Sequence, residues 1–290
     1  MLKVGFIGLG VMGFPMSSHI SSAGFTTYIY NRTANTSHQW LESNKGIITE
    51  TPGELAEQVE ILMLCVGGDE DVEEVVFGKN GIIEKIRPGT IFVDHTTTSA
   101  TLSKKMNRIF EENECFYLDA PVSGGQAGAE NAMLTVMIGG DQEAYKKSLN
   151  VINSYSKFIN YMGPSGSGQL TKMVNQISIA GLLQALAEAV NFSEKAGLDS
   201  KNVLDVISKG AAQSWQMDNR WETMTKDEFD FGFAVDWMRK DLDIVLEEAK
   251  KIGANVELTE LINNYYNELQ ESGGGRWDTS SLLKRIRNKV

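Results

Sequence analysis

Hydrophobic and polar positions follow two different patterns along the 290-residue chain, and the change comes near residue 163. Before that point, short apolar runs rich in β-branched residues alternate with amphipathic stretches. This alternation is typical of a parallel sheet wrapped by helices. The expected strands are 4–9, 26–31, 60–66, 90–95, 115–120, 134–140 and 157–163, and the expected helices between them include 51–58, 69–77 and 99–113.

The later part of the chain has no strand-like runs. Residues 166–195 keep helical spacing with few charges, which predicts one long helix linking two domains. Gly197 ends it, and several shorter helices are expected over 199–290. The sequence therefore predicts an α/β domain over 1–163 and an all-helical domain over 164–290.

Bulk composition narrows the class of protein. A net charge of -11 argues against nucleic acid as a partner, because phosphate binding needs a basic surface. No uninterrupted apolar run reaches the roughly 18 residues that span a bilayer, and the N-terminus lacks the features of a signal peptide. We therefore expect a cytoplasmic protein without a membrane partner. Cys65 and Cys115 are expected to be buried free thiols, and the three histidines have no metal-ligand spacing.

A G-x-G-x-x-G motif follows the first expected strand and opens an expected helix over 11–23. Gly8 would permit a tight turn, Gly10 the close approach of a pyrophosphate, and Gly13 close packing of helix on strand. A plain glycine-rich turn is the alternative, but the strand and helix on either side favour a Rossmann-type dinucleotide-binding domain. The expected pyrophosphate loop comprises Gly8, Leu9, Gly10, Val11, Met12 and Gly13.

The end of the second expected strand indicates which dinucleotide binds. NAD-specific folds place a carboxylate there for the ribose 2′-hydroxyl, whereas this chain has Asn31, Arg32 and Thr33. Arg32 can pair with a 2′-phosphate and stack on adenine; a solvated arginine in a turn is the alternative. We expect NADP(H) to be preferred, with NAD possible.

Two more strand ends fall where ligands bind in open α/β sheets, outside the carboxyl ends of the strands. Val66 and Gly67 could lie against the ribose or nicotinamide of the cofactor. Thr97 follows the strand 90–95. For the neighbouring Thr98 and Ser99, a helix cap is an equally good interpretation.

A loop of small residues follows the strand 115–120. Ser123, Gly124 and Gly125 offer a hydroxyl and exposed N–H groups. Successive backbone N–H groups form an anion-binding concavity, so this loop could hold a substrate carboxylate. A glycine-rich connector is the alternative.

The long expected helix begins with an unusual polar group. Lys172, Asn175 and Gln176 share one helix face in an otherwise apolar segment. A lysine that extends its amine into water is the simpler interpretation. A buried lysine near a helix start could instead act as a proton donor, because burial and the helix dipole both disfavour the charged form.

Five motifs, taken together, resemble the β-hydroxyacid dehydrogenase family. This family includes 3-hydroxyisobutyrate dehydrogenase, tartronate semialdehyde reductase, and the glyoxylate and succinic semialdehyde reductases. The motifs occur in the family's order and cover essentially the whole chain. They are GFIGLGVMG (5–13), DHTTTSA (94–100), DAPVSGG (119–125), GSGQLTKMVNQ (166–176) and FAVDWMRKDL (233–242).

The resemblance implies roles for the residues that match. Lys172 is similar to the catalytic lysine, and Asn175 to the asparagine that helps to hold the substrate. The loop that begins at Ser123 is similar to the substrate-carboxylate loop. Thr97 and Lys240 resemble residues that contact the cofactor. The family fold has a dinucleotide-binding domain, a long inter-domain helix and a helical C-terminal domain, and members are usually dimers or tetramers.

Four positions depart from the family pattern. Gln176 stands where many members have a second asparagine, which bears on substrate shape. Ala132 and Ala100 replace a frequent glycine and proline. Thr36 replaces a lysine common in NADP-preferring members, which bears on the strength of that preference.

We therefore expect an NADP(H)-dependent oxidoreductase of a short β-hydroxy acid or the matching semialdehyde, with Lys172 as general acid and base. One alternative is a catalytically silent dinucleotide-binding scaffold or sensor. Another is an imine reductase, a branch that resembles this family but usually lacks the lysine. Among the remaining polar and aromatic residues, His95 is expected to be structural and Asp278 to cap a helix, while Trp215 and Trp237 belong to a core, an interface or the border of the pocket.

Overall fold

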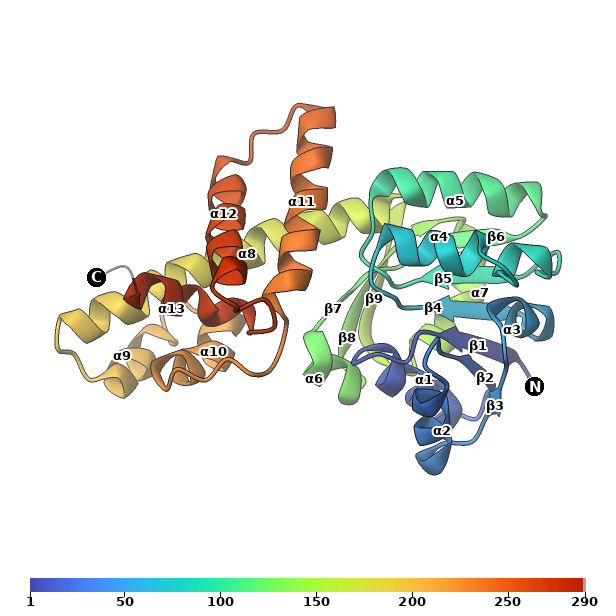
Figure 1. The fold of residues 1–290 in the computed structure, drawn as a ribbon, viewed down its shortest axis with the longest axis horizontal. Coiled ribbons are helices and arrows are strands. Elements are labelled where there is room, and N and C mark those ends of the chain that lie inside the picture. Colours follow the sequence, from blue (N-terminus) through green and yellow to red (C-terminus); the bar gives the residue numbers. More distant parts are fainter. Residues whose placement is uncertain (289–290) are drawn as a thin grey trace. The chain divides into compact units, whose positions relative to one another are not determined.

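The computed structural model describes residues 1–288 and divides the chain into two compact units, Met1–Lys172 and Met173–Val290 (Figure 1). The first is a Rossmann-type α/β domain and the second is helical. The predicted fold class is confirmed. The two compact units divide inside the long helix, at Lys172. The domain boundary expected near residue 163 stays a prediction.

A nine-stranded sheet forms the centre of the first unit. Its order is β3-β2-β1-β4-β5-β6-β8-β7, and β9 pairs with β8. The strands from β3 to β6 are parallel, whereas β8 runs antiparallel to β6 and β7. The strands are β1 (Lys3–Ile7), β2 (Thr26–Tyr30), β3 (Ile47–Ile48), β4 (Ile61–Leu64), β5 (Ile91–Asp94), β6 (Phe116–Asp119), β7 (Val122–Ser123), β8 (Leu134–Gly140) and β9 (Ser156–Gly163).

All seven expected strands are present, and β3 and β7 were missed. Both have two residues, which is too short to show alternation. The expected helices 51–58, 69–77 and 99–113 correspond to α3, α4 and α5. The helices of the first unit are α1 (Gly13–Ser22), α2 (Ala34–Ser43), α3 (Pro52–Gln58), α4 (Asp69–Phe77), α5 (Ala100–Glu112), α6 (Gly125–Glu130) and α7 (Gln142–Ile152).

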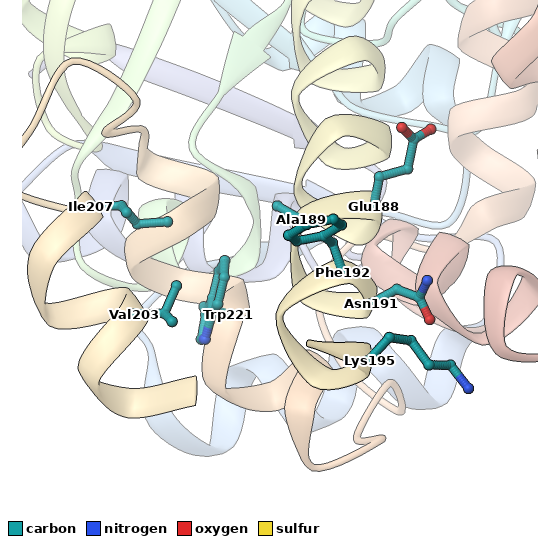
Figure 2. Close-up of a pocket in the computed structure, with 8 residues that line it drawn as sticks. All are labelled: Glu188, Ala189, Asn191, Phe192, Lys195, Val203, Ile207 and Trp221. Carbon is teal, nitrogen blue, oxygen red and sulfur yellow. The ribbon is translucent and has the colours of Figure 1, made fainter. Parts of the chain in front are cut away.

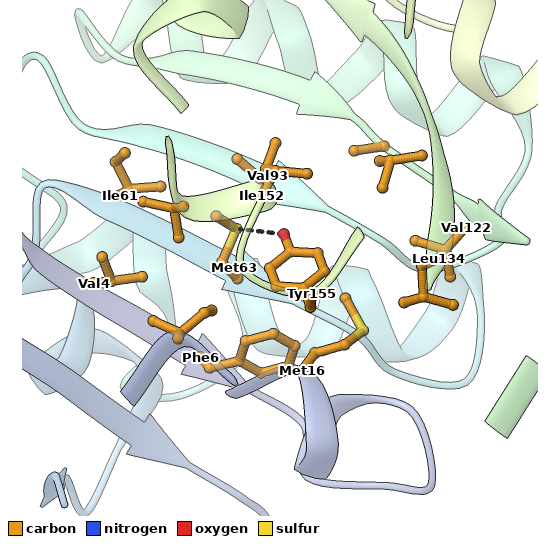
Figure 3. Close-up of a cluster of buried hydrophobic side chains, with 14 of the residues drawn as sticks. Val4, Phe6, Met16, Ile61, Met63, Val93, Val122, Leu134, Ile152 and Tyr155 are labelled. Atoms are coloured by element: carbon orange, nitrogen blue, oxygen red, sulfur yellow. Dashed lines mark hydrogen bonds between the residues drawn. The ribbon is translucent and has the colours of Figure 1, made fainter. Parts of the chain in front are cut away.

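Helices cover both faces of this sheet, and each face has its own apolar core. On β4, Ile61 and Met63 join the core beneath α1, α2, α6 and α7, while Leu62 and Leu64 join the core beneath α3, α4 and α5. Figure 3 shows the first of these cores, where Tyr155 lies against Met63. A strand buried on both faces needs an almost continuous apolar run. This explains why the parallel strands were readable from the sequence.

The second unit is built on the long helix α8 (Ser167–Lys195), which corresponds to the helix expected over 166–195. Its core gathers buried side chains from α8, α10, α11, α12 and α13, including those of Leu186, Trp221, Met238 and Tyr266. The other helices are α9 (Ser200–Ile207), α10 (Trp215–Thr225), α11 (Val235–Ile252), α12 (Glu257–Glu271) and α13 (Leu282–Arg287).

Among the described residues, α8 is the one helix long and apolar enough, by length and composition, to cross a membrane. The search for uninterrupted apolar runs missed α8, because scattered polar residues interrupt its sequence. Its mean hydropathy nevertheless stays high enough for a membrane span. Ala180, Leu183, Ala187 and Val190 lie in the core of the second unit. A core helix passes the same test as a membrane span, so α8 gives only weak support for a membrane location.

Candidate active site

The glycine motif forms the turn between β1 and α1. Gly8 has a φ of 92°, and a Cβ there would lie 2.2 Å from the carbonyl oxygen of Cys65. A Cβ on Gly13 would lie 1.8 Å from the carbonyl oxygen of Gly8. Both positions therefore require glycine, as expected for a tight turn and close packing. At Gly10 a Cβ would meet no atom within 4 Å, so the loop is open on that side.

The turn lies at the point where the strand order reverses, between the carboxyl ends of β1 and β4. Dinucleotides bind at this switch point in doubly wound sheets. Val11 is exposed, and α1 begins at Gly13, two residues later than expected. The open loop and the free start of α1 fit a dinucleotide pyrophosphate.

Asn31 ties the end of β2 to the glycine turn. Its Oδ1 accepts from the N–H of Leu9 at 2.9 Å, and its Nδ2 donates to the carbonyl oxygen of Thr33 at 3.1 Å. The Asn31 side chain thus stabilises the glycine turn through the N–H of Leu9. Val66 is tied to the end of β5 instead, because its N–H donates to Oγ1 of Thr96 at 3.1 Å.

Arg32 extends away from the same turn. Its side chain is 89% exposed, and Nη1 lies 3.6 Å from Oδ1 of Asp71 in the first turn of α4. Exposed pairs of this kind contribute little to stability. The guanidinium can therefore turn toward a phosphate without a large loss.

Polar residues at the end of β5 are mostly structural. His95 is buried, with Nδ1 at 2.6 Å from the carbonyl oxygen of Ala120 and Nε2 at 2.8 Å from the hydroxyl of Tyr155. Burial lowers the pKa of His95 to about 4, and the hydrogen bond to Ala120 opposes this. His95 is a neutral core residue, as expected. Burial raises the pKa of its neighbour Asp94 to about 7, against the hydrogen bonds from Thr96 and Tyr117.

The next residues divide between the two interpretations. Ser99 caps α5 by accepting from the N–H of Leu102, and its hydroxyl donates to Asp69 at 2.6 Å. The cap interpretation is therefore correct for Ser99. Thr97 is half-buried at the end of β5, while Thr98 is fully buried. Of these residues, Thr97 is the candidate for cofactor contact.

Lys172 and the small-residue loop meet at β7, the strand that follows β6. Lys172 is only 8% exposed, and its Nζ donates to the carbonyl oxygen of Val122 at 2.9 Å. Val122 directly precedes Ser123. The interpretation of Lys172 as a lysine extended into water is therefore wrong. Gly124 and Gly125 are exposed and have φ values of 136° and 63°, a backbone that glycine adopts readily.

Asn175, Gln176 and Lys240 are joined through a residue that sequence reasoning missed. Nδ2 of Asn175 donates to Oε1 of Gln176 at 2.8 Å, and Nε2 of Gln176 donates to Oδ2 of Asp241 at 2.7 Å. Oδ1 of Asp241 lies 3.2 Å from Nζ of Lys240. Asp241 is buried in α11. A carboxylate beside Lys240 on an otherwise core-facing helix position was the signal that could have found it.

The remaining candidates have structural roles or are exposed. Asp278 caps the short 3₁₀ helix Thr279–Ser281 by accepting from the N–H of Ser280, which confirms the expected cap. Trp215 is 52% exposed and Trp237 is 40% exposed, so neither is a core residue of the second unit. Cys115 is a buried free thiol, as expected. Cys65 is also free but only half-buried, and it directly follows the carboxyl end of β4. Within residues 1–288, no cluster of His, Cys, Asp or Glu is arranged to hold a metal ion.

The surface cavities of the described residues 173–288 include one beside α8 and one beside α11. Figure 2 shows the first, of about 570 Å³, bounded by α8, α9 and α10 with Phe192, Val203 and Trp221 in its lining. None of the predicted site residues lines it. The second, of about 480 Å³, includes Lys240 beside Arg239 and Asp243. The hydrogen bonds of the predicted site residues therefore locate the candidate active site better than the size of a cavity does.

Comparisons with known proteins agree with this arrangement. Residues 3–163 match the NAD-binding domain of 6-phosphogluconate dehydrogenase, and residues 166–286 match the NAD-binding region of NADP-dependent 3-hydroxyisobutyrate dehydrogenase. An uncharacterized oxidoreductase of Shewanella frigidimarina is 51% identical over 99% of this chain and 98% of its own. The 2-hydroxy-3-oxopropionate reductase of Escherichia coli is 33% identical over 98% of this chain and 97% of its own.

A solved structure of similar fold is the 3-hydroxyisobutyrate dehydrogenase of Mycobacterium tuberculosis with L-serine. It has a TM-score of 0.89 and 26% identity, covering 99% of each chain. The fold, the glycine turn and these matches define an enzyme, a dehydrogenase or reductase that uses a nicotinamide dinucleotide. The chain belongs to the β-hydroxyacid dehydrogenase family, together with 3-hydroxyisobutyrate dehydrogenase and 2-hydroxy-3-oxopropionate reductase.

Proposed function

We propose that this enzyme reduces a short semialdehyde acid, of the glyoxylate or succinic semialdehyde kind, with NADPH, and catalyses the reverse oxidation of the matching hydroxy acid. NADP(H), when bound, supplies or accepts the hydride. The protein supplies the carboxylate site, the proton and the orientation of the reacting groups.

The position of the Lys172 amine carries this proposal. The amine is held out of bulk water, 2.9 Å from the backbone oxygen that precedes Ser123. A substrate whose carboxylate lies on the N–H groups of Ser123, Gly124 and Gly125 would therefore have its carbonyl within reach of a proton donor. A pocket built from backbone N–H groups and one amine favours a short acid.

Lys172 can act in both directions. Reduction places negative charge on the substrate oxygen, and the ammonium stabilises that charge and gives up a proton. Oxidation needs the neutral amine, which removes the proton from the hydroxyl. Asn175, one helical turn further along α8, would hold the same substrate oxygen or its neighbour, and Gln176 fixes the orientation of the Asn175 amide.

Preference for NADP(H) over NAD(H) is part of the proposal and rests on Arg32. The exposed guanidinium at the end of β2 stands where NAD-specific proteins carry an acid. Its bidentate geometry suits a 2′-phosphate. Thr97 and Lys240 are proposed to contact the cofactor, with Val66 and Gly67 beside it. A cytoplasmic location and a homodimer or homotetramer complete the proposal.

The test is a panel of substrates followed by the absorbance of the reduced nicotinamide. Glyoxylate, succinic semialdehyde and 2-hydroxy-3-oxopropionate are offered with NADPH and with NADH, and 3-hydroxyisobutyrate is offered with NADP and NAD. We expect the highest kcat/KM for a semialdehyde acid with NADPH. A clear preference for NAD with 3-hydroxyisobutyrate would overturn both the direction and the cofactor preference.

The panel also separates this function from the imine reductase alternative. A cyclic imine without a carboxylate has nothing to place on the Ser123–Gly125 loop, so it should be a poor substrate. Turnover of the imine with none of the acids would contradict the proposal. Lys172→Ala serves as the control, since it removes the proton donor but leaves the glycine turn unchanged.

A further inference from the structure

One buried carboxylate fastens the start of α8 to the sheet. The first N–H groups of a helix have no partner inside the helix. Here the N–H groups of Gly166 and Gln169 both donate to Asp119, at 2.7 Å to Oδ1 and 2.9 Å to Oδ2. Asp119 is the last residue of β6 and is fully buried. Both oxygens of a single side chain thus hold the helix start against the sheet.

Glycines make room for this close approach. A Cβ on Gly168 would lie 2.5 Å from the carbonyl oxygens of Asp119 and Met137, and a Cβ on Gly139 would lie 2.7 Å from Oδ1 of Asp119. Any larger residue would push the helix away from the sheet. The start of α8 is therefore packed against β6 and β8 as tightly as the backbone allows.

Gln169 adds a second attachment, to the end of β5. Its buried Nε2 donates to the carbonyl oxygen of Thr96 at 2.7 Å, and its Oε1 accepts from the N–H of Thr98 at 3.1 Å. These two bonds bracket Thr97, the proposed cofactor contact. One amide side chain thus joins the Thr97 backbone to the helix that carries Lys172.

The attachment and the amine are in register. The N–H of Gln169 donates to Asp119, and Nζ of Lys172 donates to the carbonyl oxygen of Val122. Lys172 is three residues after Gln169, and Val122 is three residues after Asp119. The segment 119–122 therefore runs beside the first turns of α8. Movement of the helix along this segment would shift the Lys172 amine with it, by about 1.5 Å for each residue.

Burial of the charged Asp119 carboxylate costs free energy. Burial raises the pKa of Asp119 to about 6, while the N–H donors of Gly166 and Gln169 oppose that rise. A neutral residue would avoid the penalty for a buried charge. Carboxylates perturbed in this way are enriched at functional sites.

We infer that Asp119 and Gln169 are positioning residues for Lys172: they lock the first turn of α8 onto the ends of β5 and β6, so that the amine is held at a fixed place beside the Ser123–Gly125 loop. The inference rests on the proposed role of Lys172. It assigns no contact with substrate to either residue. Their effect on the reaction passes through the position of the amine.

Asp119→Asn is the first test, because it keeps the shape of the side chain and replaces one accepting oxygen with a donor. We expect kcat to fall by about 10²-fold, the loss typical of a small misplacement of a catalytic group. The Kd for NADPH, measured by cofactor fluorescence, should not change. Gln169→Leu is the second variant, should Asp119→Asn fail to fold. It should lower kcat and also raise the Kd for NADPH, since it frees the backbone around Thr97.

Asp141 provides a matched control for the loss of a helix cap. Its Oδ1 accepts from the N–H of Ala144 at 2.7 Å and caps α7, which carries none of the proposed site residues. Asp141→Ala should lower the melting temperature and leave kcat unchanged. If Asp141→Ala and Asp119→Asn reduce kcat equally, the effect is one of stability and the inference is wrong.

A double variant separates this inference from the proposed function. In a Lys172→Ala background, Asp119→Asn should cause no further loss of kcat, because residues that act as a unit are not additive. A full additional loss would show that Asp119 acts by another route. If Lys172→Ala is inactive while Asp119→Asn and Gln169→Leu keep the kcat of the unmodified enzyme, only the inference fails. If Lys172→Ala keeps full activity, the proposed chemistry fails with it.

Discussion

The side-chain amide of Gln176 donates to the buried carboxylate of Asp241 at 2.7 Å and accepts from the amide of Asn175 at 2.8 Å. Gln176 is the position where many family members carry a second asparagine. A glutamine side chain is one methylene longer, so it reaches Asp241 from α8. The departure from the family pattern thus has a specific partner, and it fixes the direction in which the Asn175 amide points.

The first prediction concerns this chain of amides. Gln176→Leu removes both hydrogen bonds and leaves the size of the side chain nearly unchanged. We expect the KM for the acid substrate to rise by about tenfold, the effect of about 1.4 kcal/mol from a lost hydrogen bond to a charged group. The Kd for NADPH should change less. Steady-state kinetics at saturating NADPH gives the result, and an unchanged KM would remove Gln176 from the substrate site.

The second prediction concerns the proton donor. Lys172→Met keeps the apolar stem and removes the amine, so kcat should fall by about 10²–10⁴-fold. Binding of NADPH, measured by fluorescence, should be retained, because the glycine turn is far from Lys172 in the sequence. The hydrogen bond from Leu9 to Asn31 and the close packing at Gly8 and Gly13 stabilise that turn independently. A variant that binds NADPH with the same Kd and still reduces the aldehyde at the original rate would exclude Lys172 as the acid.

The third prediction concerns the choice of dinucleotide. Arg32→Gln should raise the KM for NADPH and leave the KM for NADH nearly constant, because the lost partner is the 2′-phosphate. Asp71→Asn is the complementary change, since it removes the carboxylate that lies 3.6 Å from the guanidinium. It should lower the KM for NADPH. Parallel changes with both cofactors would show that Arg32 does not read the phosphate.

The fourth prediction concerns the carboxylate loop. Gly124→Ala places a Cβ on a residue with a φ of 136°, at 3.1 Å from Cδ2 of Leu134, and so distorts the loop. The KM for glyoxylate should rise more than the KM for an aldehyde without a carboxylate. Gly89→Ala is the control, because Gly89 also has a positive φ, of 85°, but has open space around it and lies away from the proposed site. It should change stability by about 1 kcal/mol and neither KM.

The fifth prediction concerns the dependence of stability on pH. Burial raises the pKa of Asp94 to about 7, whereas an unfolded aspartate titrates near its ordinary value of 3.8. Between these values the folded protein holds a proton that the unfolded chain has released. This contribution to the free energy of unfolding therefore falls as pH rises from about 4 to about 7.

Asp94→Asn removes that dependence and keeps the hydrogen bond from the N–H of Thr96, which its oxygen can accept. The hydrogen bond that Tyr117 donates to Asp94 is reversed, because the new amide donates to the Tyr117 hydroxyl oxygen. The variant should gain stability relative to the unmodified protein as pH rises. Urea unfolding at about pH 5 and about pH 8 measures the difference. His95 works in the opposite direction, because its lowered pKa favours the folded state at higher pH, but it is present in both proteins and cancels. An equal difference at both pH values would contradict the prediction.

Local patterns made most of the fold and part of the site predictable. The glycine turn was recognisable because the strand, the three glycines and the helix follow one another in sequence. The spacing of Lys172, Asn175 and Gln176 was recognisable because a helix repeats every 3.6 residues. Asp119 and Asp241 lay inside the family motifs but carried no local signal of their partners.

The sequence by itself determined the class of fold, the order of its elements and the candidate dinucleotide turn, since each of these depends on spacing between near neighbours. Only the tertiary structure decided that Asp119 holds Gln169, that Lys172 points to Val122, and that Asp241 receives the amide of Gln176. These pairs are 50 to 65 residues apart. Their contacts depend on strand order and on how each helix packs, which local periodicity does not encode.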